Sequence, residues 1–381
     1  MTDEVKQRKL EHVKIALEED VAVPQRANWN DVHFVHQSLP EVNLDAIDMS
    51  VEFLGQRLRY PIFISSLTGG HPDVTTINRN LARAAEEYGL ALGVGSQRAA
   101  LVNAEVEGSF AITRQQAPHA FLIANIGAPQ LIAQEGHPAF TLEQIQRAIS
   151  MIGANALAVH LNSLQEATQP EGDRRAVGIA SSLQALTKQL PLPVIAKETG
   201  AGICREQALL FRSYGIAAID VGGAGGSSMP ALEAMRARSH GNTAAMNLGL
   251  LYQNWGIATP IAIVEASSAR VPLIATGGIR TGLDMARALA LGATLVGVGL
   301  PFLKAASQSY EAVQEWLERF IQELKIAMQL SGAASIAQMR EVDVVLLGET
   351  REWLTVRGFE NEIKGLAQRR WRRFQATQPE A

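Results

Sequence analysis

The chain has 381 residues, of which 47% are hydrophobic and 19% charged, and its formal net charge is −4 at pH 7. This balance is typical of a globular protein and excludes a disordered or fibrous one. The acidic charge does not favour a nucleic-acid or membrane-surface protein, because such proteins are usually basic. The single cysteine, Cys204, excludes an internal disulfide framework, a cysteine-rich zinc site and an iron–sulfur cluster held by this chain alone.

The N-terminal segment MTDEVKQRKLEHVK is charged and lacks the apolar region of a secretory signal. No chargeless run reaches the ~18–20 apolar residues that a membrane-spanning helix needs. We therefore expect a cytoplasmic protein with no membrane partner. The tail GLAQRRWRRFQ is locally basic, and we interpret it as a terminal helix with solvated arginines, not as a nucleic-acid site.

Residues 1–60 form an N-terminal extension in which a charged helix is expected over residues 5–19. Eight short, mostly apolar runs follow, at residues 62–66, 91–95, 120–125, 156–160, 193–197, 217–221, 272–276 and 294–298. Most are continuously apolar, as strands buried on both faces are, so they predict a parallel sheet.

Helical segments are expected between these runs, at residues 78–88, 142–153, 207–214 and 282–291, and Gly89, Gly153 and Gly215 stand where helices should end. Eight strand–helix units within residues 61–301 predict an α/β fold, a (β/α)8 TIM barrel, with a doubly wound sheet as the alternative. Residues 302–374 read as two or three C-terminal amphipathic helices. We expect one domain over residues 1–381, with two longer connections at 168–176 and 222–257.

Chemically active side chains gather after the predicted strands, where barrel enzymes place their active sites. Glycine in these turns needs no functional explanation. The turns do not explain the polar residues Asn125, His160, Gln165, Glu166 and Lys197. The strand ends therefore predict an active site.

The segment TGGIRTG, residues 276–282, predicts a phosphate site. Its glycines allow close backbone approach, and we expect the following helix N-terminus to present N–H groups to an anion. Gly299 and Leu300, after the eighth run, complete the corner where many barrels bind phosphate.

Lys197 ends a buried strand, where an ammonium group needs an anion or an electron-rich ring. Adjacent strand residues point to opposite faces, so Glu198 is a poor partner and a ligand is expected. Glu166 is a candidate Mg²⁺ ligand, because Mg²⁺ accepts few protein ligands and keeps waters or ligand phosphates. A helix-capping role is the alternative for Glu166.

Ten motifs then occur in one order along almost the whole chain. They are RKLEH (8–12), ISSLTGG (64–70), GVGSQRAAL (93–101), NIGAPQ (125–130), HLNSLQEATQPEGDR (160–174), KETGAGI (197–203), GGAGGSS (222–228), NWGIAT (254–259), TGGIRTG (276–282) and GLPFL (299–303). Together they resemble the flavin-dependent, type 2 isopentenyl diphosphate isomerases. Three departures are visible. Leu67 stands where the family usually has Met, and GGSSM (225–229), with Ser227, stands where GGTSW is more typical. The rest of the segment after the sixth run differs moderately.

The resemblance implies specific ligands and residue roles. It implies an FMN site made by Ser66, Leu67, Thr68, Ser96, Asn125, Lys197 and Ser227, with the flavin phosphate at Gly277, Gly278, Ile279, Arg280, Gly299 and Leu300. It implies that a substrate diphosphate is held by Arg8, Lys9, Ser96, Gln97 and Arg98, with His160 and Asn162 adjacent. Gln165 is implied beside the reacting alkene and Glu166 as the Mg²⁺ ligand. The resemblance also implies NADPH as the flavin reductant and a homo-oligomer, a tetramer or octamer.

The isomerisation of isopentenyl diphosphate fits this set of implied ligands and residues. Moving the double bond needs one proton added to a weakly basic alkene and another removed nearby, and no Asp, Glu or Cys at the strand ends stands as an obvious acid–base pair. The resemblance implies that reduced flavin acts as acid and base through N5, with Lys197 stabilising its negative charge. An FMN-dependent barrel oxidoreductase is one alternative, and net consumption of NADPH or oxygen would support it. A non-catalytic flavin or phosphate-binding protein is the other, and it predicts no effect of substituting Gln165.

Overall fold

A closed eight-stranded parallel barrel forms the centre of the molecule. The computed structural model describes residues 2–23, 25 and 28–377, with side chains described for residues 10–23, 25, 28–373 and 375. The barrel strands are β4 (Ile62–Ile64), β5 (Ala91–Gly93), β6 (Phe121–Gly127), β7 (Ala156–Leu161), β8 (Val194–Glu198), β9 (Ala218–Asp220), β10 (Leu273–Thr276) and β11 (Leu295–Val298). They pair in chain order, and β11 pairs with β4 to close the ring. The predicted (β/α)8 barrel is confirmed, and the doubly wound sheet is excluded.

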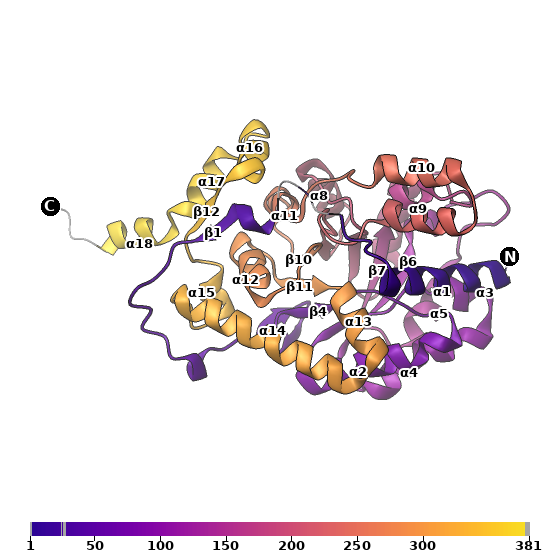
Figure 1. The fold of residues 1–381 in the computed structure, drawn as a ribbon, viewed down its shortest axis with the longest axis horizontal. Helices are drawn as coiled ribbons and strands as arrows, with labels where there is room; N and C mark the ends of the chain where they lie inside the picture. The colour runs from indigo at the N-terminus through magenta and orange to yellow at the C-terminus, as the bar shows by residue number, and fades with distance from the viewer. Residues whose placement is uncertain (1, 24, 26–27, 378–381) are drawn as a thin grey trace.

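Helices connect the strands around the outside of the barrel (Figure 1). In chain order they are α2 (Thr75–Tyr88), α3 (Arg98–Val102), α4 (Gly108–Gln116), α5 (Leu142–Met151), α6 (Ser163–Thr168), α7 (Ile179–Gln189), α8 (Arg205–Ser213), α9 (Met229–Ser239), α10 (Thr243–Tyr252), α11 (Thr259–Ser267), α12 (Gly282–Leu291) and α13 (Leu300–Gln308). The long connection predicted at residues 222–257 contains α9 and α10. These two helices pack against each other and cover α6 beside the barrel mouth.

The N-terminal extension contains α1 (Thr2–Glu18), β1 (Val32–Phe34) and the hairpin of β2 (Val51–Phe53) and β3 (Gln56–Leu58). β1 pairs antiparallel with β12 (Val344–Leu346), so the extension is joined to the C-terminal segment by a small sheet. α1 packs against α9 and α13, near the carboxyl ends of the barrel strands.

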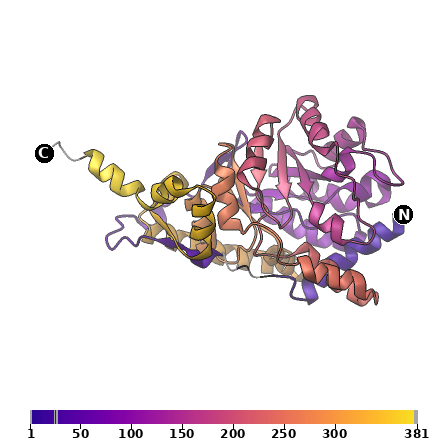
Figure 2. The same ribbon diagram turned by 90° about the horizontal axis from the view of Figure 1, so that it is seen from above.

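The prediction of two or three helices for residues 302–374 was wrong. After α13, the chain forms α14 (Tyr310–Leu330), α15 (Ile336–Met339), β12, α16 (Gly348–Val356), α17 (Glu360–Ala367) and α18 (Arg369–Thr377). Gly332 and Gly358 take φ angles of 63° and 80° just after α14 and α16, and this left-handed backbone ends each helix. α14 packs on α2, α12 and α13, whereas the last helices of the chain extend from the barrel on the side away from the N-terminus (Figure 2).

The barrel interior is apolar until the carboxyl ends of the strands. β4, β5, β6, β9 and β11 are buried throughout, whereas β7, β8 and β10 become partly accessible only at their last residues. Continuous burial explains why these strands read as unbroken apolar runs. The fold therefore opens to ligands at its carboxyl end.

Candidate active site

A cavity of about 350 Å³ lies at the carboxyl ends of the strands, within the size range of small-molecule sites. His12 and Val13 of α1 contribute one wall. The cavity brings together most of the residues expected from sequence, namely Ser66, Leu67, Thr68, Ser96, Arg98, Asn125, His160, Asn162, Gln165, Glu166, Lys197, Ser227, Gly277, Gly278, Ile279, Arg280, Gly299 and Leu300. Arg8 and Lys9 lie in α1, but their side chains fall outside the described part of the structure.

Gln97 does not join the others, contrary to the expected substrate contact. Its side chain is fully buried, donates to the carbonyl oxygen of Ala148 at 2.7 Å and accepts from the backbone N–H of Asn125 at 2.9 Å. This amide links β6 to α5 beneath the cavity. Its polar atoms are therefore used within the fold, and we correct its role to a structural one.

Lys197 has a carboxylate partner that the sequence analysis did not identify. Its Nζ atom donates to Oδ2 of Asp220 at 2.9 Å and to the backbone oxygen of Glu198 at 3.2 Å. Lys197 and Asp220 face each other in the register of β8 and β9, so both side chains point to the same face. A protein carboxylate, Asp220, therefore neutralises Lys197, where the sequence analysis expected a ligand. Lys197 also lines the cavity, and the Glu198 carboxylate is not its salt-bridge partner.

The glycine-rich corner presents a different backbone from the one expected. The N-terminus of α12 is capped by two carboxylates of the protein. Asp284 accepts from the N–H groups of Arg280 and Thr281, and Glu323 of α14 accepts from the N–H of Gly282. That helix N-terminus is therefore not open to an anion. α13 begins beside the cavity at Leu300 with Gly299 as its N-cap and no capping side chain, so it offers the N–H groups that a phosphate needs.

The two glycine-rich loops pack directly on each other at this corner. A Cβ atom on Gly277 would come within 2.3 Å of the carbonyl oxygen of Gly223, and one on Gly278 within 2.8 Å of that of Gly225. Glycine at these positions is required by close backbone contact and by φ angles of 128° and 68°. The loops after β9 and β10 thus form one cradle, with Ser227 and Ile279 both lining the cavity.

Polar atoms without protein partners suit this cavity to a cofactor with many hydrogen-bonding groups. Among the described side chains, the buried hydroxyl oxygens of Ser66 and Thr276 and the amide oxygen of Asn162 have no hydrogen-bond partner, and all three residues line the cavity. Buried polar atoms without partners are costly, so they point to a polar ligand. The residues present fit FMN, with the phosphate at the glycine-rich corner.

His160, on β7, is oriented by Asn125 on the neighbouring strand β6. Its Nδ1 atom lies 2.8 Å from Oδ1 of Asn125, whose amide nitrogen donates to the carbonyl oxygen of Val94 at 3.1 Å. Since that amide nitrogen is already a donor, Oδ1 of Asn125 accepts and Nδ1 of His160 carries the hydrogen. The pair therefore sets both the ring orientation and the tautomer of His160.

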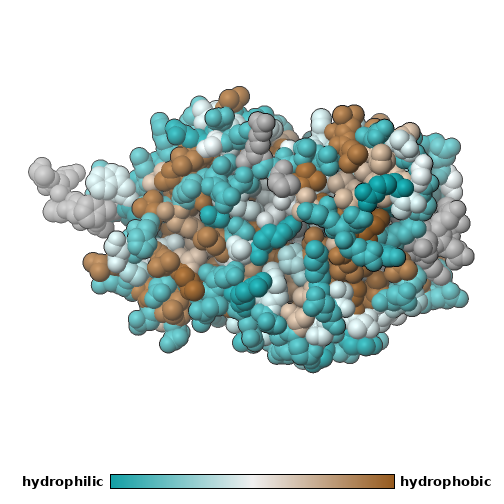
Figure 3. All heavy atoms as spheres, viewed as in Figure 1, coloured by the Kyte–Doolittle hydropathy of each residue, from teal (hydrophilic) through white to brown (hydrophobic). Residues whose placement is uncertain are grey.

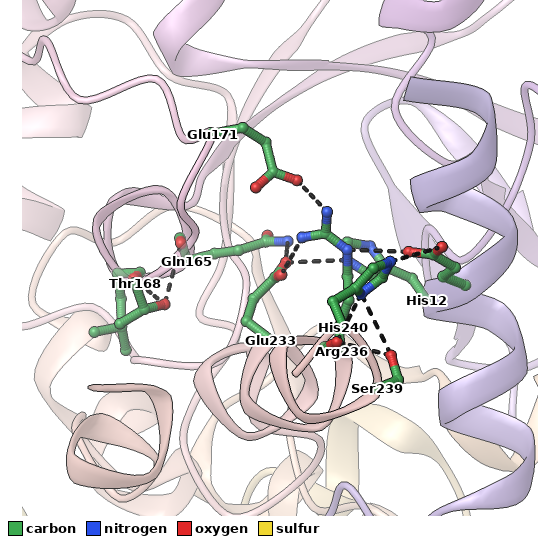
Figure 4. Close-up of polar contacts among 10 residues, drawn as sticks. His12, Gln165, Thr168, Glu171, Glu233, Arg236, Ser239 and His240 are labelled. Carbon is green, nitrogen blue, oxygen red and sulfur yellow. Dashed lines mark hydrogen bonds and ion pairs between the residues drawn. The ribbon is translucent and has the colours of Figure 1, made fainter. Parts of the chain in front are cut away.

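Gln165 belongs to a charged network between α6, α9 and α1 (Figure 4). Its Nε2 atom donates to Oε1 of Glu233 at 3.1 Å, and Nε2 of His12 lies 3.0 Å from the same oxygen. Arg236 binds the other oxygen of Glu233 at 3.0 Å and also contacts Glu11 and Glu171. Burial alone would raise the pKa of Glu233, but His12, Gln165 and Arg236 lower this pKa to about 2. The carboxylate is thus ionised and holds the Gln165 amide in one orientation.

Glu166 and Arg98 meet through Asp173 at the outer part of the cavity. Glu166 accepts from the Asn162 amide at 2.7 Å and from the backbone N–H of Asp173 at 2.8 Å. The Asp173 carboxylate in turn binds Arg98 at 2.5 Å and lies 3.1 Å from Nε2 of His137. No group of three or more potential metal-ligating side chains was found among the described residues. Any metal at Glu166 would therefore need ligands other than a cluster of His, Cys, Asp and Glu side chains.

Glu198 holds the loop that follows β8 at the edge of the cavity. Its Oε2 atom accepts from the backbone N–H groups of Thr199, Gly200 and Ala201 at 2.5–2.6 Å. Burial raises the pKa of Glu198 to about 7, although these three donors favour its charged form.

Sequence reasoning missed Asp220, Glu233 and Asp173. A signal existed for Asp220, the one charged residue in the otherwise apolar run AAIDV. Asp173 lies in the quoted motif QPEGD, but its neighbours come from distant segments. Glu233 gave no signal, since its burial depends on α1 and α6 packing against α9.

The fold and the cavity define a barrel flavoprotein. The family described as FMN-dependent dehydrogenase matches residues 111–345. The structure is similar to the flavin-binding domain of baker's yeast flavocytochrome b2 (TM-score 0.62, 16% identity, covering 87% of this chain and 81% of that one). It is also similar to a mandelate oxidase variant with an FMN adduct (TM-score 0.56, 20% identity, covering 89% and 99%). At these identities the likeness shows the fold alone.

Sequence comparison gives the particular family. The chain is 46% identical over 360 residues to an isopentenyl-diphosphate delta-isomerase of Methanosarcina barkeri, covering 94% of this chain and 97% of that protein. It is 48% identical over 349 residues to one from Methanoregula boonei, covering 91% and 95%. The chain belongs to the isopentenyl-diphosphate delta-isomerase family. The resemblance found in the sequence motifs is confirmed.

Proposed function

We propose that this protein interconverts isopentenyl diphosphate and dimethylallyl diphosphate in isoprenoid biosynthesis, using FMN. The observation that carries the proposal is the joining of Gln165, Glu166, His160 and Lys197 in one cavity of a chain that is 46% identical to a named isomerase over 94% of its length. The reaction adds a proton to the terminal alkene carbon and removes one from the CH2 group next to the internal alkene carbon.

FMN lies in this proposal with its phosphate at Gly277–Arg280 and at the start of α13, and with its ring near Ser66, Leu67, Thr68, Asn125 and Lys197. Leu67 and Ser227 suit this placement, since one keeps an apolar surface and the other keeps a hydroxyl. When bound in its reduced form, FMN supplies acid–base chemistry that no side chain at the strand ends supplies. NADPH serves as the reductant that prepares this form and is not consumed in each turnover.

The chain's own residues bind and orient the substrate. Arg98 and Ser96, together with Arg8 and Lys9, hold the diphosphate, with His160 and Asn162 beside it. Glu166 would hold Mg²⁺, which needs few protein ligands and would help to bind the diphosphate. Gln165 lies beside the alkene, and Glu233 keeps its amide orientation constant. The electrostatic groups are thus set before the substrate arrives.

We also propose a homo-oligomer in the cytoplasm. None of the described helices has the length and apolar composition needed to cross a bilayer. Apolar side chains gather over part of the α10 region in Figure 3. The exposed apolar residues of α10 and the turn after it include Leu248, Leu250, Leu251 and Trp255. A helix apolar on all sides is usually covered, so this face supports contact with a second copy.

A direct assay tests the proposed reaction. Anaerobic incubation of the protein with isopentenyl diphosphate, FMN, Mg²⁺ and NADPH should give dimethylallyl diphosphate. Proton NMR measures the formation of this product. Omitting FMN, Mg²⁺ or NADPH in turn should abolish or sharply reduce the rate. A protein that binds and reduces FMN but forms no product would contradict the substrate assignment.

A further inference from the structure

Asp220 lies behind Lys197 and does not line the cavity. Its side chain is fully buried in the barrel, while Lys197, about 7% exposed, lies between it and the cavity. Oδ1 of Asp220 also accepts from the backbone N–H of Gly222 at 3.3 Å, where the loop containing Ser227 begins. The Asp220 carboxylate therefore contacts both the Lys197 ammonium and the start of the glycine-rich loop that follows β9.

We propose that Asp220 is a positioning residue that aims one donor of Lys197 at the cofactor and cancels the net charge of Lys197. An ammonium group has three donors. Asp220 and the backbone oxygen of Glu198 take two of them, and no third acceptor for Nζ is found among the described residues. The remaining donor is available to a ligand in the cavity, which Lys197 lines.

The charge cancellation has a consequence for the flavin. This step rests on the proposed function, because it assumes that FMN binds beside Lys197. An ammonium paired with a carboxylate contributes a hydrogen bond with little net positive charge, so it favours an anionic reduced ring less than an unpaired ammonium would. Asp220 therefore limits how strongly the site prefers reduced over oxidised FMN.

The inference is tested first with the wild type, Asp220→Asn, Lys197→Met and the double variant that carries both substitutions. For each, the affinity of oxidised FMN and the midpoint potential of bound FMN are measured by anaerobic equilibration with a reference dye. Asp220→Asn should favour reduced over oxidised FMN by about tenfold more than the wild type does, a shift of about +30 mV for a two-electron couple.

The same substitution should have no effect in the Lys197→Met background. In that background there is no ammonium whose charge Asp220 could cancel or whose donor it could aim. Asp220→Glu should restore the wild-type potential, because it keeps the charge pair. If Asp220→Asn yields no folded protein by circular dichroism, Asp220→Ser replaces it as the neutral variant.

An unchanged potential in folded Asp220→Asn would overturn the inference. So would an equal shift with and without Lys197, since it would show that Asp220 does not act through Lys197. These outcomes leave the proposed function standing if the wild type binds FMN and forms dimethylallyl diphosphate. Wild-type protein that fails to bind FMN would contradict both the proposed function and this inference.

Discussion

Gln165 enters the cavity with its amide nitrogen already bound to the buried carboxylate of Glu233. This contact uses one of the two N–H donors of the amide and leaves the other N–H and the amide oxygen for further partners. Because Glu233 also contacts His12 and Arg236, the orientation of Gln165 depends on three elements of the fold. A side chain held this way can act on the substrate without reorganising during the reaction.

Gln165→Ala should lower kcat by at least about 100-fold, the cost typical of losing one oriented polar group in an active site. The affinity for FMN should stay within about twofold, since the variant retains the phosphate corner and Lys197. Steady-state isomerase kinetics and FMN titration check both values. Gln207→Ala, at an exposed position on α8, is the matched control. A kcat within threefold of the wild type would contradict the role of Gln165.

Glu166→Gln should raise the Mg²⁺ concentration needed for half-maximal activity by at least about tenfold, because a neutral amide binds this hard cation less strongly than a carboxylate. The variant retains an acceptor oxygen for the N–H of Asp173, so the loop should be preserved. Magnesium titrations of activity measure the change, with Glu143→Gln at an exposed position as control. An unaltered magnesium dependence would remove Glu166 as the ligand.

For single residues, the sequence predicts which side chains belong to the site better than it predicts their hydrogen-bond partners. His160 and Lys197 could be placed in the site because polar residues at the ends of apolar strands need a reason. Gln97 lies just beyond the end of β5, yet its side chain turns under the cavity because α5 offers it a carbonyl oxygen. Such partners are set by the packing of segments that are distant in sequence.

The two glycine-rich loops act as one structural unit. Their backbones touch where a side chain would have to sit, so the phosphate corner depends on contact between them. The sequence indicated both loops but neither their contact nor the side chains that cap the N-terminus of α12. The capping residues Asp284 and Thr281 are a visible helix-start signal, and they accept from N–H groups at the start of α12.

Gly278→Ala should weaken FMN binding by at least about tenfold, because the added Cβ would push the loop after β9 away from the phosphate corner. Gly241→Ala is a close control, since both glycines have a φ of 68° but the space around Gly241 is open. Both variants carry the left-handed backbone cost of about 1–2 kcal/mol. FMN titration measures the affinity of each variant for FMN. Equal affinity in the two variants would contradict the claim that contact between the two loops forms the phosphate corner.

The docking of α1 on α9 should depend on pH through Glu233. Its pKa in the folded protein, about 2, lies below the usual value of 4.5. The ionised carboxylate therefore stabilises the fold fully above about pH 4.5, and this contribution is lost as the pH falls toward 2. Glu233→Gln should lower the free energy of unfolding at pH 7 by on the order of 2–3 kcal/mol.

The difference between wild type and Glu233→Gln should narrow steadily as the pH falls below about 4.5. Urea unfolding at pH 7, 5, 4 and 3.5 measures it. Glu315→Gln, at an exposed position on α14, should show no comparable difference at any of these values. A gap that is constant across this range would show that ionisation of Glu233 does not stabilise the fold.

At the scale of the whole molecule, the barrel could be predicted because each of its strands carries its own signal. A strand buried on both faces is apolar at every position, so eight such runs in succession specify the ring. The C-terminal segment has no equivalent signal. It is attached through particular contacts, such as buried Glu265, which binds Arg357 and the indole N–H of Trp353, and the pairing of β1 with β12.

The central claim is that FMN serves isomerisation without being consumed as a redox reagent. The most direct test counts dimethylallyl diphosphate formed against NADPH oxidised, in anaerobic heavy water, by proton NMR and absorbance. We predict many molecules of product for each NADPH oxidised, with deuterium entering the product methyl group. One NADPH oxidised for each molecule of substrate converted would contradict the account and indicate an FMN-dependent oxidoreductase.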